Sequence, residues 1–494
     1  MSHVLIIIAF ASLRMLPPPG ERPWRSFDLD PLVSLLVAVV PMLALVSAAS
    51  LVTSASMKRL DRTGRTNLID AAESLAALGG TAATLWFVGA VGFFGWLDTV
   101  RLVTGDVIVL DEVIALVPLL LAYFGLAVAR HPIDKRRGDA VLVRALDRGE
   151  PIYPVPPAMA AAWRTLRHGA LTVAIPLAMI FAIGEGIDRG ATHLYKTSKP
   201  GDWIARPGVL ETVVPLAQLL GAVSILAIAP VALRIIWDTV RVPPGDLRDR
   251  LEALCERHNV RVAEHLIWRT GGTMLNAAVA GLLAPLRFIV ISDALLERLG
   301  EREVEAVAAH EVAHVRLGHM AWLAAAVLGS ITLAGGVVGL ALRFTVPGFV
   351  ETDVGQGVIV AAVIAAAIFG LGHASRRFER QADAFAVKHL SGAVRGGASV
   401  PVTAAAIGAM CGALRTVGRH NGVRLRKFTW RHGSLAGRIE ALQALEGLPS
   451  DRLPIDAAAR WVKGLALTAL VVGVGLTVLD EFLRISAQTA QLAG

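Results

Sequence analysis

Eight stretches of predominantly apolar residues dominate this 494-residue sequence and leave few folds open to it. A helix needs about 20 such residues to cross the hydrocarbon of a bilayer. Only 18% of the residues are charged, whereas a soluble domain carries about 25%. We therefore predict a mainly α-helical, polytopic membrane protein with about eight transmembrane helices. The blocks lie at 32–54, 76–97, 108–129, 168–187, 211–236, 320–342, 357–373 and 461–482.

The distribution of Lys and Arg among the loops predicts the orientation of these helices. The loops after the first and third blocks are rich in both residues, whereas 98–107 and 343–356 each carry one Arg against two carboxylates. We expect the basic loops to be cytoplasmic, together with the long hydrophilic stretches 237–319 and 374–460. Both termini then lie outside, in a multi-pass protein of the cell membrane. The loop 188–210, with four basic residues, is the least typical of the external loops.

The positions of the apolar blocks also predict how the chain is organised into regions. We predict an N-terminal membrane region at 1–236 with about five helices and a catalytic region at 237–460 that includes a membrane hairpin at 320–373. A C-terminal membrane helix and tail would occupy 461–494. The apolar segment Val4–Leu13 is too short to span a bilayer and lacks a basic region before it. It is a poor signal peptide, and we expect an interfacial or packed segment.

Charge and cysteine content exclude two classes of function. The net charge is +8, but no basic run with interleaved aromatic residues is present, so nucleic-acid binding is not indicated. Positive cytoplasmic loops account for the charge. Cys255 and Cys411 lack the CxxC spacing of a redox or metal motif. Both fall in stretches expected to face the cytosol, where thiols stay reduced.

Residues 302–319 read REVEAVAAHEVAHVRLGH, in which apolar residues recur at the spacing of a helix. His310 and His314 are therefore i and i+4 on one helix face, where two imidazoles can bind a single zinc ion. Glu311 lies beside them, in the position of a general base. A chance match with surface histidines explains this motif equally well by itself, so a third ligand has to decide between the interpretations.

Glu379 is the candidate for that ligand, because a catalytic zinc takes three protein ligands and keeps one position open. It lies in the segment 376–387, which reads RRFERQADAFAV, and two apolar blocks separate it from His314. Since these blocks form a hairpin, His310 and Glu379 should both lie within roughly 10–15 Å of one membrane surface. Asp383, one turn further on, is expected to accept the N–H of a zinc-bound imidazole. The alternative for both carboxylates is a solvated helix face paired with neighbouring arginines.

Two further histidines, His319 and His373, lie near the expected membrane boundaries and could approach the metal. Histidine is common at such boundaries, and we expect neither to be a ligand.

From about 243 to 442 the sequence resembles the membrane metallopeptidases that include HtpX and the type I CAAX prenyl endopeptidases. The resemblance rests on the order and spacing of four segments: LNAAVAG (275–281), FIVISDALLERL (288–299), HEVAH (310–314) and ERQAD (379–383). It implies a gluzincin-like catalytic unit with a small β-sheet. It also implies that Asn276, Ala277 and Ala278 belong to an edge strand that binds the peptide substrate, and that Gly281 ends this strand.

The resemblance further implies a late His…Arg element in HGSLAGRIEAL (432–442). His432 and Arg438 would stabilise the oxyanion of the reaction or orient the helix that carries the third ligand. The family usually has Pro after this His, where Gly433 stands here. The alternative is an ordinary helix N-terminus with a surface Arg. The first five apolar blocks match no motif of the family.

These observations predict a zinc endopeptidase with one Zn²⁺ per chain, acting on peptide or protein substrates at the lipid bilayer. Glu311 would activate the attacking water. Two other classes remain: an inactive scaffold of the same family, and a transporter with carboxylates inside the membrane. Among substrates, membrane proteins in quality control are preferred over CAAX-type processing. The sequence gives no indication of the oligomeric state.

Overall fold

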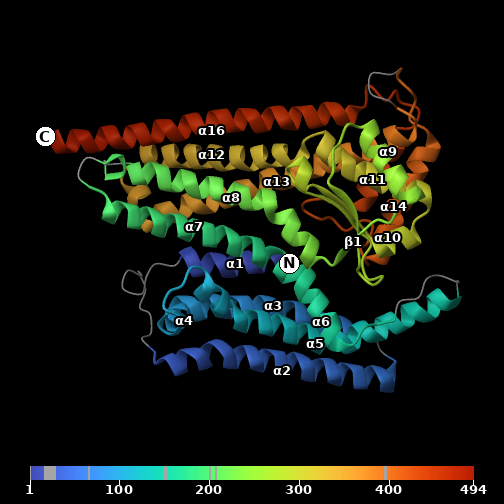
Figure 1. The fold of residues 1–494 in the computed structure, drawn as a ribbon, viewed down its shortest axis with the longest axis horizontal. Helices are drawn as coiled ribbons and strands as arrows, with labels where there is room; N and C mark the ends of the chain where they lie inside the picture. The colour runs from blue at the N-terminus through green and yellow to red at the C-terminus, as the bar shows by residue number, and fades with distance from the viewer. Residues whose placement is uncertain are drawn as a thin grey trace. The chain divides into compact units, whose positions relative to one another are not determined.

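The computed structural model describes residues 2–15, 29–64, 67–147, 154–199, 202–205, 209–393 and 398–493. The chain divides into two compact units, Met1–Asp238 and Thr239–Gly494. Among the described residues, eight helices are long and apolar enough to cross a membrane, and each overlaps one of the predicted blocks. A small mixed sheet is present as well. The predicted fold class, a mainly α-helical polytopic membrane protein with a small sheet, is confirmed (Figure 1).

The first unit consists of helices. They are α1 (Ser2–Met15), α2 (Pro31–Thr63), α3 (Asn67–Phe94), α4 (Trp96–Thr104), α5 (Leu110–Asp147), α6 (Ala158–Leu166), α7 (Thr172–Thr197) and α8 (Val209–Ile236). One π-helical turn, Arg167–Leu171, joins α6 and α7 into a single long apolar span. A 3₁₀ turn, Trp203–Ala205, precedes α8.

Helix α1 contains the segment Val4–Leu13 and is packed inside the first unit. Ile6, Ala9 and Phe10 are buried in a core shared with α3 and α7, and the ring of Phe10 lies 5.5 Å from that of Phe181. Of the two expectations for this segment, the packed one is therefore observed.

The second block was predicted to run to residue 97, but α3 ends earlier, at Phe94. Gly95 has φ +62°, a left-handed conformation that stops the helix and that glycine adopts without strain. The chain then turns into the short helix α4. Trp96, its first residue, is buried and donates its indole N–H to the carbonyl of Ala115.

The second unit carries a four-stranded sheet in the order β1-β2-β4-β3. Its strands are β1 (Thr239–Arg241), β2 (Glu264–Trp268), β3 (Ala277–Ala280) and β4 (Phe288–Ser292). β2 and β4 are parallel, and the other two pairs are antiparallel. β4 reads FIVIS and is buried along its whole length, as expected of an apolar run in an inner strand.

Short helices surround this sheet. They are α9 (Asp246–Arg257), α10 (Asp293–Arg298), α11 (Glu301–Arg316), α14 (Ala404–His420) and α15 (Leu435–Gln443). Ile289 and Ile291 of β4 share one core with Ala308 and Val312 of α11 and Met410 of α14. This core fixes α11, the helix with the HEVAH motif, against the sheet.

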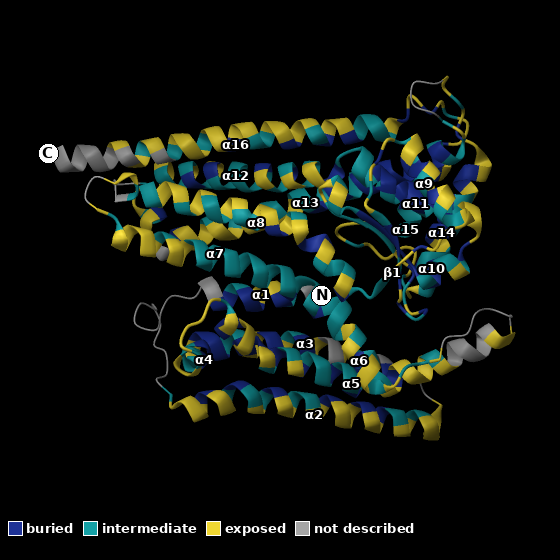
Figure 2. Cartoon of the chain, in the orientation of Figure 1, coloured by how far each residue is buried: buried dark blue, intermediate teal, exposed yellow. Residues whose placement is uncertain are grey.

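Three long helices of the second unit make its membrane part: α12 (His319–Thr345), α13 (Asp353–Leu390) and α16 (Pro454–Ala493). Glycines let α12 and α16 approach closely, since a Cβ at Gly329 would lie 2.8 Å from the carbonyl oxygen of Ala466. Much of the surface of these helices is exposed and apolar, as a lipid-facing surface should be (Figure 2). In Figure 1 the sheet and helices α9, α11 and α14 lie together at one end of them.

Candidate metal centre

Helix α11 brings HEVAH to the sheet because its two ends are defined locally. At its start, the side chain of Glu303 accepts the backbone N–H of Gly300 at 3.1 Å, which completes a capping arrangement. At its end, Gly318 has φ +68° and turns the chain directly into the membrane helix α12. The buried face between these ends is mostly Ala and Val, so the helix packs closely against β3, α13 and α14.

Three side chains from two helices converge beside the sheet. Nε2 of His310 lies 3.3 Å from Nε2 of His314 and 3.8 Å from Oε2 of Glu379. Nε2 of His314 lies 3.9 Å from Oε1 of Glu379. Within the described part of the chain, these residues form the one group of three that could hold a metal ion. Tetrahedral zinc with bonds of about 2.0–2.1 Å would need ligand atoms roughly 3.3 Å apart, so a small contraction would satisfy the ion.

The two imidazoles present the same nitrogen to this point. Burial disfavours the charged form of His310, but Asp383 and Glu379 beside it raise its pKa above the ordinary value. Burial lowers the pKa of His314 to about 3, so its ring is neutral at pH 7, as metal binding requires. Nδ1 of His310 lies 2.9 Å from Oδ1 of Asp383, but the ring is not aligned for a hydrogen bond. A small rotation of the ring would complete that bond and leave Nε2 free for the metal.

Glu311 lies between the ligands and the sheet. Its Oε2 accepts the backbone N–H of Val279, in β3, at 3.2 Å. Burial raises the pKa of this carboxyl to about 7, which is close to the value that suits a general base at neutral pH.

Arg438, from α15, is buried and bridges two carboxylates of α13. Its Nε and Nη2 donate to the two oxygens of Asp383 at 2.7 and 2.6 Å, and its Nη1 lies 3.1 Å from Oε2 of Glu379. Although burial opposes the charge, Asp383 and Glu379 raise the pKa of Arg438 above its ordinary value. Of the two roles implied for this residue, orienting the third-ligand helix agrees with these contacts.

His432 contacts the other carboxylate oxygen of Glu379 and is half-exposed. Its Nδ1 lies 3.1 Å from Oε1 of Glu379. Gly433, which replaces the proline usual in the family, has φ +74°, a conformation that proline cannot adopt. Proline is therefore incompatible with the turn that this chain makes before α15. Ser434 then caps that helix by accepting the N–H of Gly437.

The predicted substrate strand is at the edge of the sheet, since β3 pairs with β4 alone. Asn276 lies one residue before the strand, and its carbonyl accepts the N–H of Ser292. Residues of an antiparallel pair alternate between bonding their neighbour and pointing away. Ala278 therefore bonds β4, whereas Ala277 and Val279 direct their N–H and C=O groups outward. The N–H that Val279 donates to Glu311 agrees with this register. Gly281 ends the strand as predicted, with φ +119°.

The remaining histidines differ from each other. His373 stacks on Phe369, with ring centroids 6.0 Å apart. His319 lies behind His314, with the two Nδ1 atoms 3.0 Å apart, so it contacts a proposed ligand instead of the metal position. The i, i+5 spacing of His314 and His319 was visible in the sequence, but the bend at Gly318 that brings the rings together was not.

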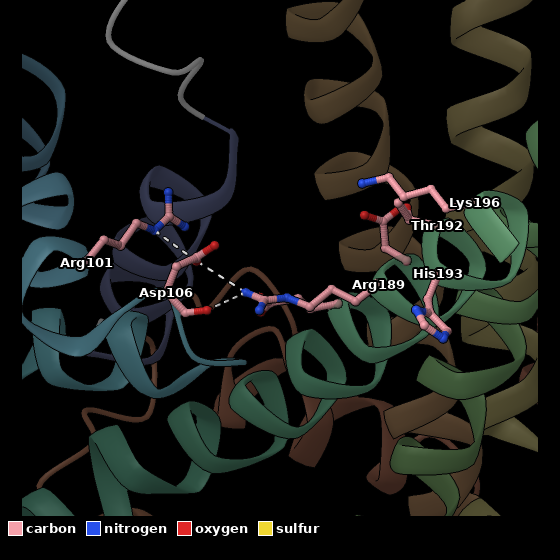
Figure 3. A pocket seen from close by; sticks show the side chains of 8 residues that line it. Arg101, Asp106, Arg189, Thr192, His193 and Lys196 are labelled. Atoms are coloured by element: carbon pink, nitrogen blue, oxygen red, sulfur yellow. Dashed lines mark hydrogen bonds and ion pairs between the residues drawn. The ribbon is translucent and has the colours of Figure 1, made fainter.

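A cavity of about 530 Å³ lies in the first unit, between α4, the α4–α5 loop and α7 (Figure 3). Arg101 and Arg189 both point toward Asp106, at 3.6 and 3.2 Å. The charged residues that line the cavity balance, with Arg101, Arg189 and Lys196 against Asp106, Glu185 and Asp188. This balance gives no basis for selecting an ion or a charged ligand.

The region around the metal centre is similar in sequence to known proteins. Residues 244–446 match the family described as Peptidase family M48. A protein of Arabidopsis thaliana described as "CAAX prenyl protease 1 homolog" is 33% identical over 162 residues, which cover 30% of this chain and 37% of the relative. The match thus spans little more than a third of that relative. The crystal structure of S. mikatae Ste24p aligns with 84% of this chain and 98% of its own, at 15% identity and a TM-score of 0.36. At that score no residue or activity can be carried over.

Proposed function

Residues 244–446 of this chain match peptidase family M48, and on that premise we propose that the protein is a membrane-embedded, zinc-dependent endopeptidase. The observation that carries the proposal is the convergence of His310, His314 and Glu379 from two helices, with Glu311 beside them. The resemblance to membrane metallopeptidases, noted from HEVAH and ERQAD, is confirmed by the family match.

In this mechanism one Zn²⁺, held by the three ligands, would act as a Lewis acid toward the scissile carbonyl and lower the pKa of its water to about 7. Glu311 takes the proton of the attacking water and delivers it to the leaving amine. Asp383 would hold the ring of His310 once the ring rotates to donate to it, and Arg438 holds the carboxylates of Asp383 and Glu379. His432, whose Nδ1 lies 3.1 Å from Oε1 of Glu379, would donate a hydrogen bond to the oxyanion.

The substrate would bind as an added strand on β3. The outward N–H and C=O groups of Ala277 and the C=O of Val279 can pair with an extended peptide, which exposes its amides to attack as a helix cannot; the N–H of Val279 is donated to Glu311. The small alanine side chains of this strand let another backbone approach closely. Main-chain pairing supplies affinity with little dependence on substrate sequence, which suits the quality control of membrane or membrane-associated proteins.

CAAX-type processing is the second candidate, favoured by the name of the Arabidopsis relative. The purified protein should be incubated with casein and, separately, with a farnesylated CAAX peptide, with Glu311→Gln as the control. Cleavage of casein alone supports quality control, and selective cleavage of the prenylated peptide supports processing. No cleavage of either substrate by a protein that retains zinc would favour the inactive scaffold.

The transporter alternative receives less support. The buried carboxylates Asp111 and Glu112 lie in the first turn of α5 and not at mid-helix, and both interact with Arg101, at 2.6 and 3.4 Å. They fit a structural ion cluster better than a path for ions.

Metal analysis of variants tests the assignment of roles. His310→Ala, His314→Ala and Glu379→Ala should each lose zinc, because each removes a ligand. Glu311→Gln should retain zinc and lose turnover, because only the base is removed. Zinc lost from Glu311→Gln and retained by Glu379→Ala would overturn the assignment.

We also propose that the active site faces the cytoplasm. Native Cys255 and Cys411 are both buried, so a newly introduced cysteine can be labelled selectively.

A further inference from the structure

We propose that the C-terminal membrane helix α16 sets the tautomer and orientation of the metal ligand His314 through a relay formed by His319, Gln381 and Asp456. This inference rests on the proposed zinc site. It extends that site to a helix that lies wholly outside the region 244–446 matched by the peptidase family.

The relay consists of consecutive short contacts. Nδ1 of His314 lies 3.0 Å from Nδ1 of His319. Nε2 of His319 lies 3.1 Å from Oε1 of Gln381, and Nε2 of Gln381 donates to Oδ1 of Asp456 at 2.9 Å. The other oxygen of Asp456 accepts from Lys388. Elements α11, α12, α13 and α16 each contribute at least one member.

The chemistry of the last member sets the direction of every bond. A carboxylate only accepts, so Asp456 requires the amide nitrogen of Gln381 to face it, and the amide oxygen then faces His319. That oxygen requires a proton on Nε2 of His319, which leaves Nδ1 of the neutral ring as an acceptor. Nδ1 of His314 must therefore carry the proton. Its Nε2 lone pair is then directed toward His310 and Glu379, as a metal ligand needs.

The geometry leaves His319 little freedom to take another arrangement. Its side chain is fully buried, and its ring stacks on Phe378 with centroids 4.6 Å apart and planes 4° from parallel. Phe378 immediately precedes the ligand Glu379 in α13. His319 is the first residue of α12, so the left-handed Gly318 is what turns it back against His314.

A second contact ties α16 to the same junction. Nζ of Lys463 donates to the carbonyl of Leu317, at the end of the zinc helix, at 2.8 Å. The same ammonium lies 5.6 Å from the ring of Trp322 and 5.7 Å from that of Phe378. Helix α16 thus holds both the end of α11 and the relay that leads to its second histidine.

The alternative is that these groups satisfy one another only because they are buried. The two interpretations differ in what happens to the metal. A positioning relay affects zinc retention and ligand geometry when its direction is changed, whereas simple burial affects only stability.

His319→Phe is the first test, because phenylalanine can keep the stack on Phe378 and removes both nitrogens. Zinc should leave this variant about 10–100-fold faster than the wild type in competition with a chelator. His319→Gln, whose amide can accept and donate, should recover part of the loss. His373→Phe is the matched control, since His373 also stacks on an aromatic ring of α13 but has no contact with His314 among the described residues. It should release zinc at the wild-type rate.

A charge exchange further from the metal is the second test, and it applies even if His319→Phe fails to fold. Gln381→Glu sets two carboxylates against each other. Asp456→Asn replaces a group that only accepts by an amide that accepts or donates, so the direction of the bonds is no longer fixed. Each variant should therefore accelerate zinc release. In the double variant Gln381→Glu/Asp456→Asn, the new amide at 456 can donate to the new carboxylate at 381. The carboxylate then lies one residue nearer the metal along the relay. Its release rate should return to within about threefold of the wild type, and its Co²⁺-substituted form should show a shifted ligand-field spectrum. Thermal unfolding of the metal-free proteins reports stability separately.

The outcomes separate the two proposals. If wild-type protein holds zinc through Glu379 but releases it at an unchanged rate in His319→Phe, the relay is wrong and the zinc site stands. The same conclusion follows if the double variant releases zinc as fast as the faster of the two single variants. If the wild type binds no zinc, the proposed function fails and the relay fails with it.

Discussion

Replacement of Arg438 by methionine tests how far the proposed site depends on one buried cation. The guanidinium makes two bonds to Asp383, at 2.7 and 2.6 Å, and lies 3.1 Å from Glu379. The side chain of Asp383 is only 1% exposed, so water cannot replace the lost partner. Breaking a buried ion pair by removing one member costs about 3–5 kcal/mol. We expect Arg438→Met to lower the stability of the metal-free protein by that order.

The lost stability should be recovered in part when the unpaired charge of Asp383 is also removed. In Asp383→Asn/Arg438→Met neither charge of the pair remains, so the two substitutions should couple favourably by about 0.5–3 kcal/mol. Thermal unfolding in detergent with chelator present measures this coupling without a contribution from the metal. Arg415→Met is the control, because Arg415 is exposed on α14 and such a change should stay within about 0.5 kcal/mol.

Zinc affinity supplies the second measurement on the same variants. Since Asp383 faces His310, its loss should weaken zinc binding about 10–100-fold even where the double variant regains stability. If the change in unfolding free energy of the double variant equalled the sum of the two single changes, the claim that Arg438 acts through Asp383 would be refuted. Wild-type zinc affinity in the double variant would reduce Asp383 to a structural partner of the arginine.

Three further predictions concern the substrate strand, the membrane topology and the packing of α16. Ala277→Pro should raise KM about 2–10-fold with zinc content unchanged, because it removes one outward donor worth about 0.5–1.5 kcal/mol. Ala278→Pro should instead destabilise the fold, because it removes a backbone hydrogen bond to β4. If Ala277→Pro and Ala278→Pro changed KM and stability equally, the register of β3 would be refuted. Single cysteines at Glu351 and Glu440, both exposed, should label from opposite sides of intact cells with an impermeant reagent, and external labelling at Glu440 would invert the proposed topology. Gly473→Leu should separate α12 from α16, because a Cβ there would lie 2.4 Å from the backbone N of Leu333, and zinc release should accelerate; an unchanged rate would contradict the coupling of α16 to the site.

The sequence by itself determined the features that depend on local spacing. The length of an apolar block decides whether it can cross a bilayer, so the eight spans could be predicted one by one. The 3.6-residue period of a helix puts His310 and His314 on one face without reference to the rest of the chain. The hairpin between the two motifs returns Glu379 to the surface it left, and α12 and α13 form that hairpin.

Contacts between distant segments were decided only by the tertiary structure. Arg438 lies 55 residues from Asp383, and Asp456 lies 75 residues from Gln381, so no local pattern relates either pair. The outward direction of Ala277 and Val279 depends on the register of β3 against β4, which a shift of one residue would reverse. The placement of His319 behind His314 depends on the bend at Gly318 and on the packing of Phe378. In each case the side chains meet because buried surfaces pack in one arrangement, and that arrangement depends on the whole fold.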